Sequence, residues 1–274
     1  AAETTDTNSL TAFLGNGFSV GTTGLFNTSG NSYISWNWKK SVTSGVDIVT
    51  YTGNGANRTI AHALGVAPTY LIVKKRGSGG AGAYGWYQWH TGLTSAAYSL
   101  LFDTAAESNT PTLWNSTAPN SSVFSVGTSN GSNENGQDYI AYLFAEVPGF
   151  SRIGKYTGNG SVDGPFIWTG FKPAFVMIKK TDTAADWGIF DNKRAPYNVV
   201  DGPLHPHVTN AEVKPDATTN LDFLANGIKI RNVHNNWNIS GGTYIYAAFA
   251  EAPFKYSSAA DSAGGAAFFL GMSF

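Results

Sequence analysis

The segment Tyr-Thr-Gly-Asn-Gly occurs twice in this chain, at residues 51–55 and again at residues 156–160. The interval is 156 − 51 = 105 residues, about the length of an ordinary domain. A long internal repeat constrains the fold strongly, because each copy is one structural unit that folds in the same way as the other. The sequence therefore predicts two units of similar structure.

Other motifs keep the same interval. The run LIVKK after Pro68 corresponds to VMIKK after Pro173, and YIAYLFAEVP from Tyr139 corresponds to YIYAAFAEAP from Tyr244. The differences 173 − 68 and 244 − 139 both equal 105. Because the interval is constant from one end of the unit to the other, we interpret it as a tandem duplication.

A third, incomplete copy lies at the N-terminus. FSVGT occurs at Phe18 and at Phe124, and a tyrosine follows 15 residues later in both places, at Tyr33 and Tyr139. Either the chain is the C-terminal piece of a longer protein, or its first residues complete a sheet elsewhere. The predicted divisions are a partial unit, two complete units and a tail that is a possible assembly strand, at residues 1–45, 46–150, 151–256 and 257–274.

Each unit is predicted to consist of about six to eight short strands, the number typical of a β-sandwich. Short alternating or apolar runs are bounded by Gly, Asn, Ser or Pro, and no long stretch has the 3.6-residue period of a helix. Aromatic residues make up 14% of the chain and charged residues 13%, which also suits strands. The predicted fold class is all-β, with tandem antiparallel β-sandwiches of jelly-roll or lectin-like type. The paired lysines after the apolar runs are expected where these strands leave the core for solvent.

The Gly-Asn-Gly of each copy predicts a tight turn after the first strand of its unit, since these residues tolerate positive φ. A phosphate-binding loop would require a following Lys-Ser or Lys-Thr and a helix, and neither is present. The residues assigned to this structural turn are Gly53, Asn54, Gly55, Gly158, Asn159 and Gly160.

Charge and composition exclude several classes of partner. The net charge is −1, from 17 basic and 18 acidic residues, so no overall field attracts nucleic acid. The chain has no cysteine, which excludes disulfides and thiolate zinc sites. It has no run of 18 apolar residues, so membrane insertion is not expected. We expect no cofactor.

The repeated motifs, among them HALGVAP, WNSTAPNSSVFSVGT, FIWTGFKPAFVMIKKTD and GGTYIYAAFAEAPFKY, resemble a recurring region of bacteriophage tail-fibre and other virion proteins. The resemblance covers most of residues 1–256. Members of that family often carry a concanavalin A-like or laminin-G-like domain upstream and have no assigned catalytic function. The resemblance therefore implies a virion protein and, for a fibre, a homo-oligomer, with a trimer possible.

Aromatic side chains are the main candidates for a ligand-binding surface. Trp86 and Trp187 occupy corresponding positions and are predicted to be core residues. Other aromatic and histidine side chains lie beside polar residues, where they suit either glycan and protein contacts or a lid over the end of a sandwich. The candidate ligand-binding residues are Trp89, His90, Trp114 and Trp237.

Two further sets of residues are interpreted as structural. His205, His207 and His234 have no spacing that defines a metal site, so we predict solvated loop histidines and no metal. Glu146 and Glu251 each follow Phe-Ala at the same place in their units, where they are expected to pair with a cation such as Lys74 or Lys179. One acid per unit does not supply the two carboxyls of a glycosidase.

The sequence thus predicts a non-enzymatic phage virion protein, a tail-fibre or appendage component located on the particle surface or tail. Its predicted partners are other virion proteins and a host-surface polysaccharide. One alternative is a capsid-decoration or assembly protein without ligand binding. A second alternative is a glycan depolymerase.

Overall fold

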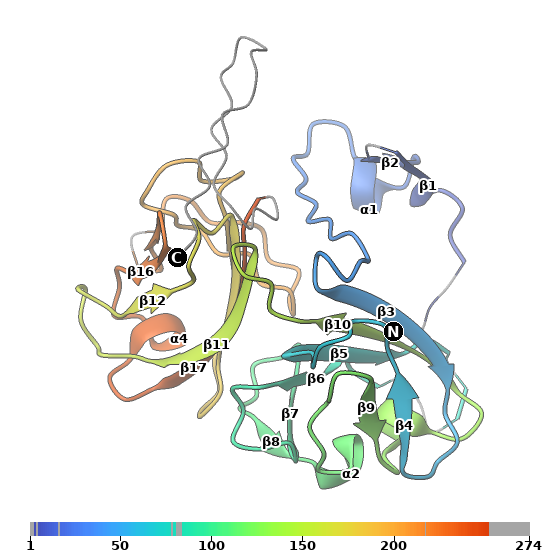
Figure 1. Ribbon diagram of the computed structural model, residues 1–274. Coiled ribbons are helices and arrows are strands. Elements are labelled where there is room, and N and C mark those ends of the chain that lie inside the picture. Colours follow the sequence, from blue (N-terminus) through green and yellow to red (C-terminus); the bar gives the residue numbers. More distant parts are fainter. Residues whose placement is uncertain are drawn as a thin grey trace, which may run out of the picture.

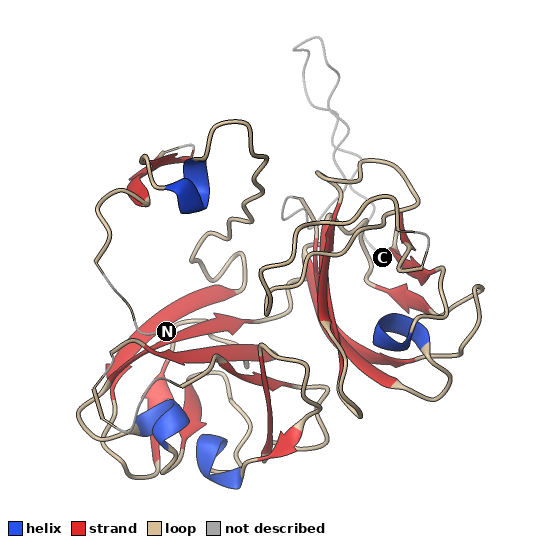
Figure 2. Ribbon diagram, turned by 180° about the vertical axis from the view of Figure 1, so that it is seen from behind, coloured by secondary structure: helices blue, strands red, loops and turns tan. Residues whose placement is uncertain are grey.

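The computed structural model describes residues 3, 5–15, 17–77, 79–80, 84–216 and 218–251. The predicted tail at residues 257–274 lies outside the described residues. The described residues form 17 strands and four helices of one turn each, and every strand pairing is antiparallel. The all-β prediction is therefore confirmed (Figure 2).

The first unit, residues 46–150, is built on a six-stranded sheet in the order β3-β10-β5-β6-β7-β8 (Figure 1). A two-stranded sheet, β4-β9, packs against one face of it, and the core between them contains Leu71, Trp114, Phe124 and Tyr139. The elements are β3 (Val46–Thr52), β4 (Arg58–Ala61), β5 (Tyr70–Lys75), β6 (Tyr87–His90), β7 (Tyr98–Leu101), β8 (Ser108–Asn109), α2 (Pro111–Trp114), β9 (Val123–Val126), α3 (Asn130–Asn133) and β10 (Asp138–Phe144).

The second unit, described over residues 151–216 and 218–251, has a four-stranded sheet, β11-β17-β13-β14, and a three-stranded sheet, β12-β16-β15. The core between these sheets contains Val176, Phe190, Ile228, Trp237 and Tyr244. The elements are β11 (Ser151–Thr157), β12 (Phe166–Trp168), β13 (Phe175–Lys180), β14 (Trp187–Asp191), β15 (Leu221–Leu224), β16 (Gly227–Ile230), α4 (Asn235–Asn238) and β17 (Thr243–Phe249).

A third core joins the two units. Along β5, Leu71 faces the core of its own unit, whereas Tyr70 and Ile72 face the second unit, because successive side chains of a strand point to opposite sides. Along β13, Phe175 and Met177 face the first unit in the same way. The large sheets are thus buried on both faces, which explains why their central strands are continuous apolar runs.

The N-terminal segment, residues 3–45, contributes a hairpin of β1 (Leu10–Leu14) and β2 (Gly17–Val20), followed by α1 (Gly24–Asn27). Residues 28–40 form no strand. They run between the two units, where Trp38 makes edge contacts with Phe144, Phe175 and Phe249. Figure 1 shows this segment as the blue chain above the first unit.

The strand registers of the two units agree at the interval of 105 residues. Tyr51 pairs with Tyr139 in the first unit, and Tyr156 pairs with Tyr244 in the second. Both differences, 156 − 51 and 244 − 139, equal 105. The two tyrosines of each pair are also stacked, with ring centroids 5.3 and 4.9 Å apart.

The prediction that the paired lysines lie where strands leave the core is wrong. Lys74, Lys75, Lys179 and Lys180 are all buried within β5 and β13. A buried ammonium group requires partners, and polar groups supply them here. Lys75 Nζ lies 2.6 Å from Glu134 Oε2, and Lys179 Nζ donates to the carbonyl of Thr104 at 3.0 Å, with burial lowering the pKa of Lys179 to about 8.

Candidate functional site

The Gly-Asn-Gly segments follow the first strand of each unit and are held by side-chain hydrogen bonds. Asn54 and Asn133 form a reciprocal pair, in which Asn54 N donates to Asn133 Oδ1 at 3.0 Å and Asn133 Nδ2 donates to Asn54 Oδ1 at 3.1 Å. Gly55 has φ +71°, which favours glycine, and a side chain on Gly53 would collide with the carbonyl of Glu134. The turn is therefore fixed by its own residues and by the end of α3.

The second unit repeats these contacts. Asn159 N donates to Asn238 Oδ1 at 2.9 Å, and Asn238 Nδ2 donates back to Asn159 Oδ1 at 3.0 Å. Gly160 has φ +67°, and a Cβ on Gly158 would collide with the carbonyl of Ile239. Asn238, like Asn133 in the first unit, is completely buried.

The four candidate ligand-binding residues do not form an exposed platform, so that prediction is corrected. Trp89, Trp114 and Trp237 are buried in the cores of their own units. Trp89 lies on the inner face of β6 because it pairs with the inward-facing Leu71, and the other two are the buried aromatic residues of α2 and α4. A sugar ring cannot stack on an indole that is covered by core side chains.

His90, the fourth candidate, lies at the junction of the two units. Its Nδ1 accepts a hydrogen bond from Gly92 N at 2.8 Å, so the neutral ring carries its proton on Nε2. Nε2 lies 3.2 Å from the carbonyl of Tyr246 in the second unit. Complete burial lowers the pKa of His90 to about 4, so the ring is a neutral structural link rather than a ligand-binding group.

The two tryptophans predicted to be core residues differ. Trp187 is confirmed as core, since it is only 1% exposed and its Nε1 donates to the carbonyl of Leu101 at 2.9 Å. Trp86 is 39% exposed, so its assignment to the core is wrong. Trp187 packs across the junction against Phe102 of the other unit, with ring centroids 5.1 Å apart, whereas the aromatic contacts of Trp86, with Phe102 and Tyr142, lie within its own unit.

The histidines and glutamates have structural partners. His205 Nδ1 lies 2.7 Å from the carbonyl of Trp187, and the buried His207 side chain lies 3.0 Å from Asp186, so neither is a free loop histidine. Among the described residues no group of three or more histidines and acids could hold a metal. Glu146 pairs with Arg152 and Glu251 with Lys193, so the pairing is as predicted but the suggested lysine partners were wrong.

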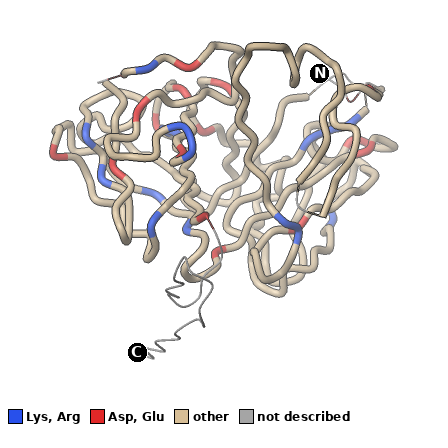
Figure 3. Tube along the Cα trace, turned by 90° about the horizontal axis from the view of Figure 1, so that it is seen from above, with Lys and Arg blue, Asp and Glu red and all other residues tan. Residues whose placement is uncertain are grey.

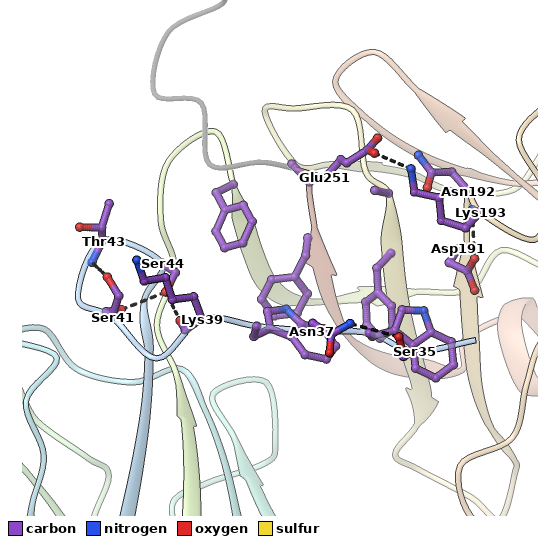
Figure 4. A pocket seen from close by; sticks show the side chains of 17 residues that line it. Ser35, Asn37, Lys39, Ser41, Thr43, Ser44, Asp191, Asn192, Lys193 and Glu251 are labelled. Carbon is purple, nitrogen blue, oxygen red and sulfur yellow. Dashed lines mark hydrogen bonds and ion pairs between the residues drawn. The ribbon is translucent and has the colours of Figure 1, made fainter. Parts of the chain in front are cut away.

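The best candidate site is a groove of about 570 Å³ between the N-terminal segment and the second unit. Figure 4 shows its polar side chains, with Ser35 and Asn37 on the N-terminal segment and Asn192 and Lys193 on the loop after β14. Its apolar wall comes from Phe150, Phe175 and Phe249 and from the half-buried Trp36 and Trp38. This combination of aromatic surface and a few polar groups is typical of a small-molecule site.

Two polar atoms of the groove residues are buried without a hydrogen-bond partner among the described residues. They are Trp36 Nε1, a donor, and Asn192 Oδ1, an acceptor. Unpartnered indole N–H groups also occur in the cores of the two units, at Trp89, Trp114 and Trp237, so these atoms do not by themselves mark a ligand site.

The acids of the groove are not arranged for acid-base catalysis. Lys193 lowers the pKa of Glu251 through its hydrogen bond and its charge. Asp191 Oδ2 accepts from Arg194 Nε at 2.7 Å, and Asp191 Oδ1 accepts from the backbone N of Lys193 and Arg194 at 3.0 Å each. A glycosidase general acid requires a raised pKa, and Glu251 has the opposite shift.

Sequence reasoning missed this groove because it is assembled from distant segments. Its lining comes from residues near 35–44, from the start of β13, and from the ends of β14 and β17. The available signal was the cluster Trp36-Asn37-Trp38, which puts two aromatic side chains beside an amide.

Comparison with known proteins gives the family of the chain. The chain belongs to the family described as a domain of unknown function (DUF7483). The match covers residues 1–253. No curated protein and no solved structure shows significant similarity. Family membership therefore adds no activity to the geometry of the groove.

The surface charges agree with the composition. Figure 3 shows basic and acidic residues scattered along both units. None of the helices in the described part of the chain is long and apolar enough to cross a membrane.

Proposed function

We propose that this chain is a non-enzymatic virion protein of the tail-fibre type that binds host-surface polysaccharide in the groove between its N-terminal segment and its second unit. Its fold in this proposal is a pair of tandem antiparallel β-sandwiches of jelly-roll or lectin-like type. The assignment to a virion appendage rests on the resemblance of the repeated motifs to phage tail-fibre proteins.

The tandem duplication is supported by contacts that recur at one interval. The tyrosine pairs of the central strands and the asparagine pairs of the turns all differ by 105 residues between units, as in 159 − 54 and 238 − 133. Unrelated segments would not share a register and a buried side-chain network.

Glycan binding is supported above all by the aromatic wall of the groove, to which the half-buried Trp36 and Trp38 contribute. Sugar hydroxyls both donate and accept, and the C–H face of a sugar ring packs on aromatic side chains. Trp36 and Trp38 supply that surface, and Asn37 and Lys193 line the same groove. On an oligomer, weak sites of this kind gain avidity through effective concentration.

The experiment is a host-polysaccharide and glycan-array binding assay on the 274-residue chain, with Trp36→Ala as the main variant. Alanine removes the indole on which a sugar ring would pack, so binding is expected to fall roughly 10-fold. Trp86→Ala is the matched control, because Trp86 is an exposed tryptophan outside the groove.

The outcomes separate the candidate functions. Equal loss of binding in both variants, or none in Trp36→Ala, would refute the groove as the site. Absence of any glycan binding would favour the virion assembly protein. New reducing ends in the polysaccharide would favour a depolymerase, which the lowered pKa of Glu251 argues against.

A further inference from the structure

Three one-turn helices of this chain carry the same small hydrogen-bonded device. In each, the last residue is an asparagine whose Nδ2 donates to the carbonyl six residues earlier in the chain. The differences 27 − 21, 133 − 127 and 238 − 232 all equal 6. The three donor and acceptor pairs are Asn27 with Gly21 at 2.9 Å, Asn133 with Gly127 at 2.8 Å, and Asn238 with Asn232 at 2.7 Å.

A tyrosine six residues after each asparagine completes the device. Its hydroxyl donates to the carbonyl of the first helical residue and accepts from the backbone N of the residue after the helix. These tyrosines are Tyr33, Tyr139 and Tyr244. The intervals 33 − 27, 139 − 133 and 244 − 238 are all 6 residues.

In the two complete units this device holds a Gly-Asn-Gly turn. The asparagine side chain exchanges hydrogen bonds with the asparagine of the turn, and the tyrosine stacks on the tyrosine that precedes the turn. The preceding tyrosines, Tyr51 and Tyr156, donate to the carbonyls of Ser132 and Trp237 at 2.6 and 2.7 Å. As a result Asn133, Asn238, Tyr139 and Tyr244 are all 0% exposed.

In the N-terminal segment the same device has no turn to hold. Asn27 is exposed, and among the described residues no donor reaches its Oδ1. Tyr33 is 49% exposed. The following residues 32–38, which correspond to the central strands β10 and β17, have no strand on either side.

We propose that α1 and Tyr33 form an acceptor site for a strand that ends in Tyr-Thr-Gly-Asn-Gly and comes from outside residues 1–274. The turn asparagine would pair with Asn27, and the tyrosine would stack on Tyr33 and donate to the carbonyl of Phe26, which corresponds to Ser132 and Trp237. The first glycine is required because in both complete units a Cβ there would collide with the carbonyl that follows the helix. The two Tyr-Thr-Gly-Asn-Gly turns within residues 1–274 are held in their own units, so the donor strand is a third copy of this segment.

This acceptor site uses the general mode in which an added strand supplies main-chain hydrogen bonds and a local pocket supplies specificity. It is independent of glycan binding, because none of Asn27, Tyr33 and Phe26 lines the groove. It would give the protein a specific attachment point for a strand of known sequence pattern.

The probe is a fluorescent peptide of residues 151–162, which carries one natural Tyr-Thr-Gly-Asn-Gly. Fluorescence anisotropy with the complete chain is expected to show saturable binding. Asn27→Ala should weaken binding at least about 10-fold, since one reciprocal pair is lost. Asn8→Ala is the matched control, because Asn8 is an exposed asparagine of the same N-terminal segment and is not part of the device.

A second probe peptide with the Asn159→Ala change should bind at least about 10-fold more weakly than the natural peptide, for the same reason. Hydrogen exchange should show new protection within residues 24–33 when the natural peptide is present. Protection at residues 127–139 or 232–244 instead would mean that the peptide displaces the chain's own strands, and would overturn the proposal.

Two other results would also overturn it. The first is absence of peptide binding, or binding that Asn27→Ala leaves unchanged. The second is self-association of the chain that depends on Asn27 and resists excess peptide in sedimentation velocity, which would identify a second copy as the occupant.

Discussion

The two units share one hydrogen-bonded frame but fill their cores differently. In the first unit Tyr87 of β6 packs over Gly131 of α3, whereas in the second Gly188 of β14 lies under Trp237 of α4. Tyr87 and Gly188 occupy the same position, because they pair with residues 73 and 178, and 178 − 73 = 105. The large aromatic side chain has moved from the sheet to the helix.

This exchange shows which features define a unit. The strand supplies the large side chain in the first unit and the helix supplies it in the second, so the core volume is roughly conserved. Packed cores tolerate exchanges that conserve volume. The asparagine pair, the stacked tyrosines and the strand register do not change. The polar frame around the Gly-Asn-Gly turn therefore specifies the unit, and the apolar filling adapts to it.

The largest loss of stability is expected when β14 and α4 of the second unit both carry a large aromatic side chain at this contact. In Gly188→Tyr even the Cβ would overlap the ring of Trp237, so we expect a loss of more than about 4 kcal/mol in the free energy of unfolding. Urea denaturation measures the loss, and the double variant Gly188→Tyr with Trp237→Ser should recover part of it. A single variant as stable as the wild type would refute the exchange.

The next largest loss of stability is expected from replacing the asparagines that end α3 and α4, compared with the one that ends α1. Asn238→Ala or Asn133→Ala leaves several buried partners without hydrogen bonds, so each should lower the free energy of unfolding by about 3 kcal/mol. Asn27→Ala should change it by less than about 0.5 kcal/mol, because Asn27 is exposed. Thermal denaturation of the three variants tests this order, and equal effects at all three positions would contradict it.

The junction between the units should weaken in acid through His90. Its pKa is about 4 in the folded chain and 6.5 in the reference state, so the unfolded chain binds more protons between these values. The contribution of His90 is therefore intact above pH 6.5, and about 3 kcal/mol is lost as the pH falls to 4.

Urea midpoints measured between pH 4 and 7 test this expectation. The control is His90→Gln, which cannot titrate, so its stability should depend less steeply on pH. An identical pH dependence in both proteins would assign the acid sensitivity to other groups. Asp191 is the counterpart of His90 in the second unit. His90 pairs with Tyr70 and Asp191 pairs with Phe175, and 175 − 70 = 105.

Local signals in the sequence predicted the strands, the all-β class and the Gly-Asn-Gly turns, because turns and short strands depend on neighbouring residues. Burial could not be predicted in the same way. Lys179 is buried because its ammonium group reaches the carbonyl of Thr104 in the other unit, and no pattern near residue 179 encodes that contact. The groove was missed for the same reason, since Trp36 and Asn192 meet only in the folded chain.

Trp86 and Trp187 show this limit most simply and give the smallest predicted effect. They correspond in sequence, yet Trp187 is buried against Leu101 and Phe102 of the other unit, whereas Trp86 contacts Tyr142 and Phe102 of its own unit and stays 39% exposed. We expect Trp86→Ala to lower the free energy of unfolding by about 1 kcal/mol or less, and Trp187→Ala to cost several times more. Urea denaturation of both variants decides the point. Similar losses would mean that the neighbouring unit does not determine the burial of Trp187, and hence that the two units fold without using each other's surfaces.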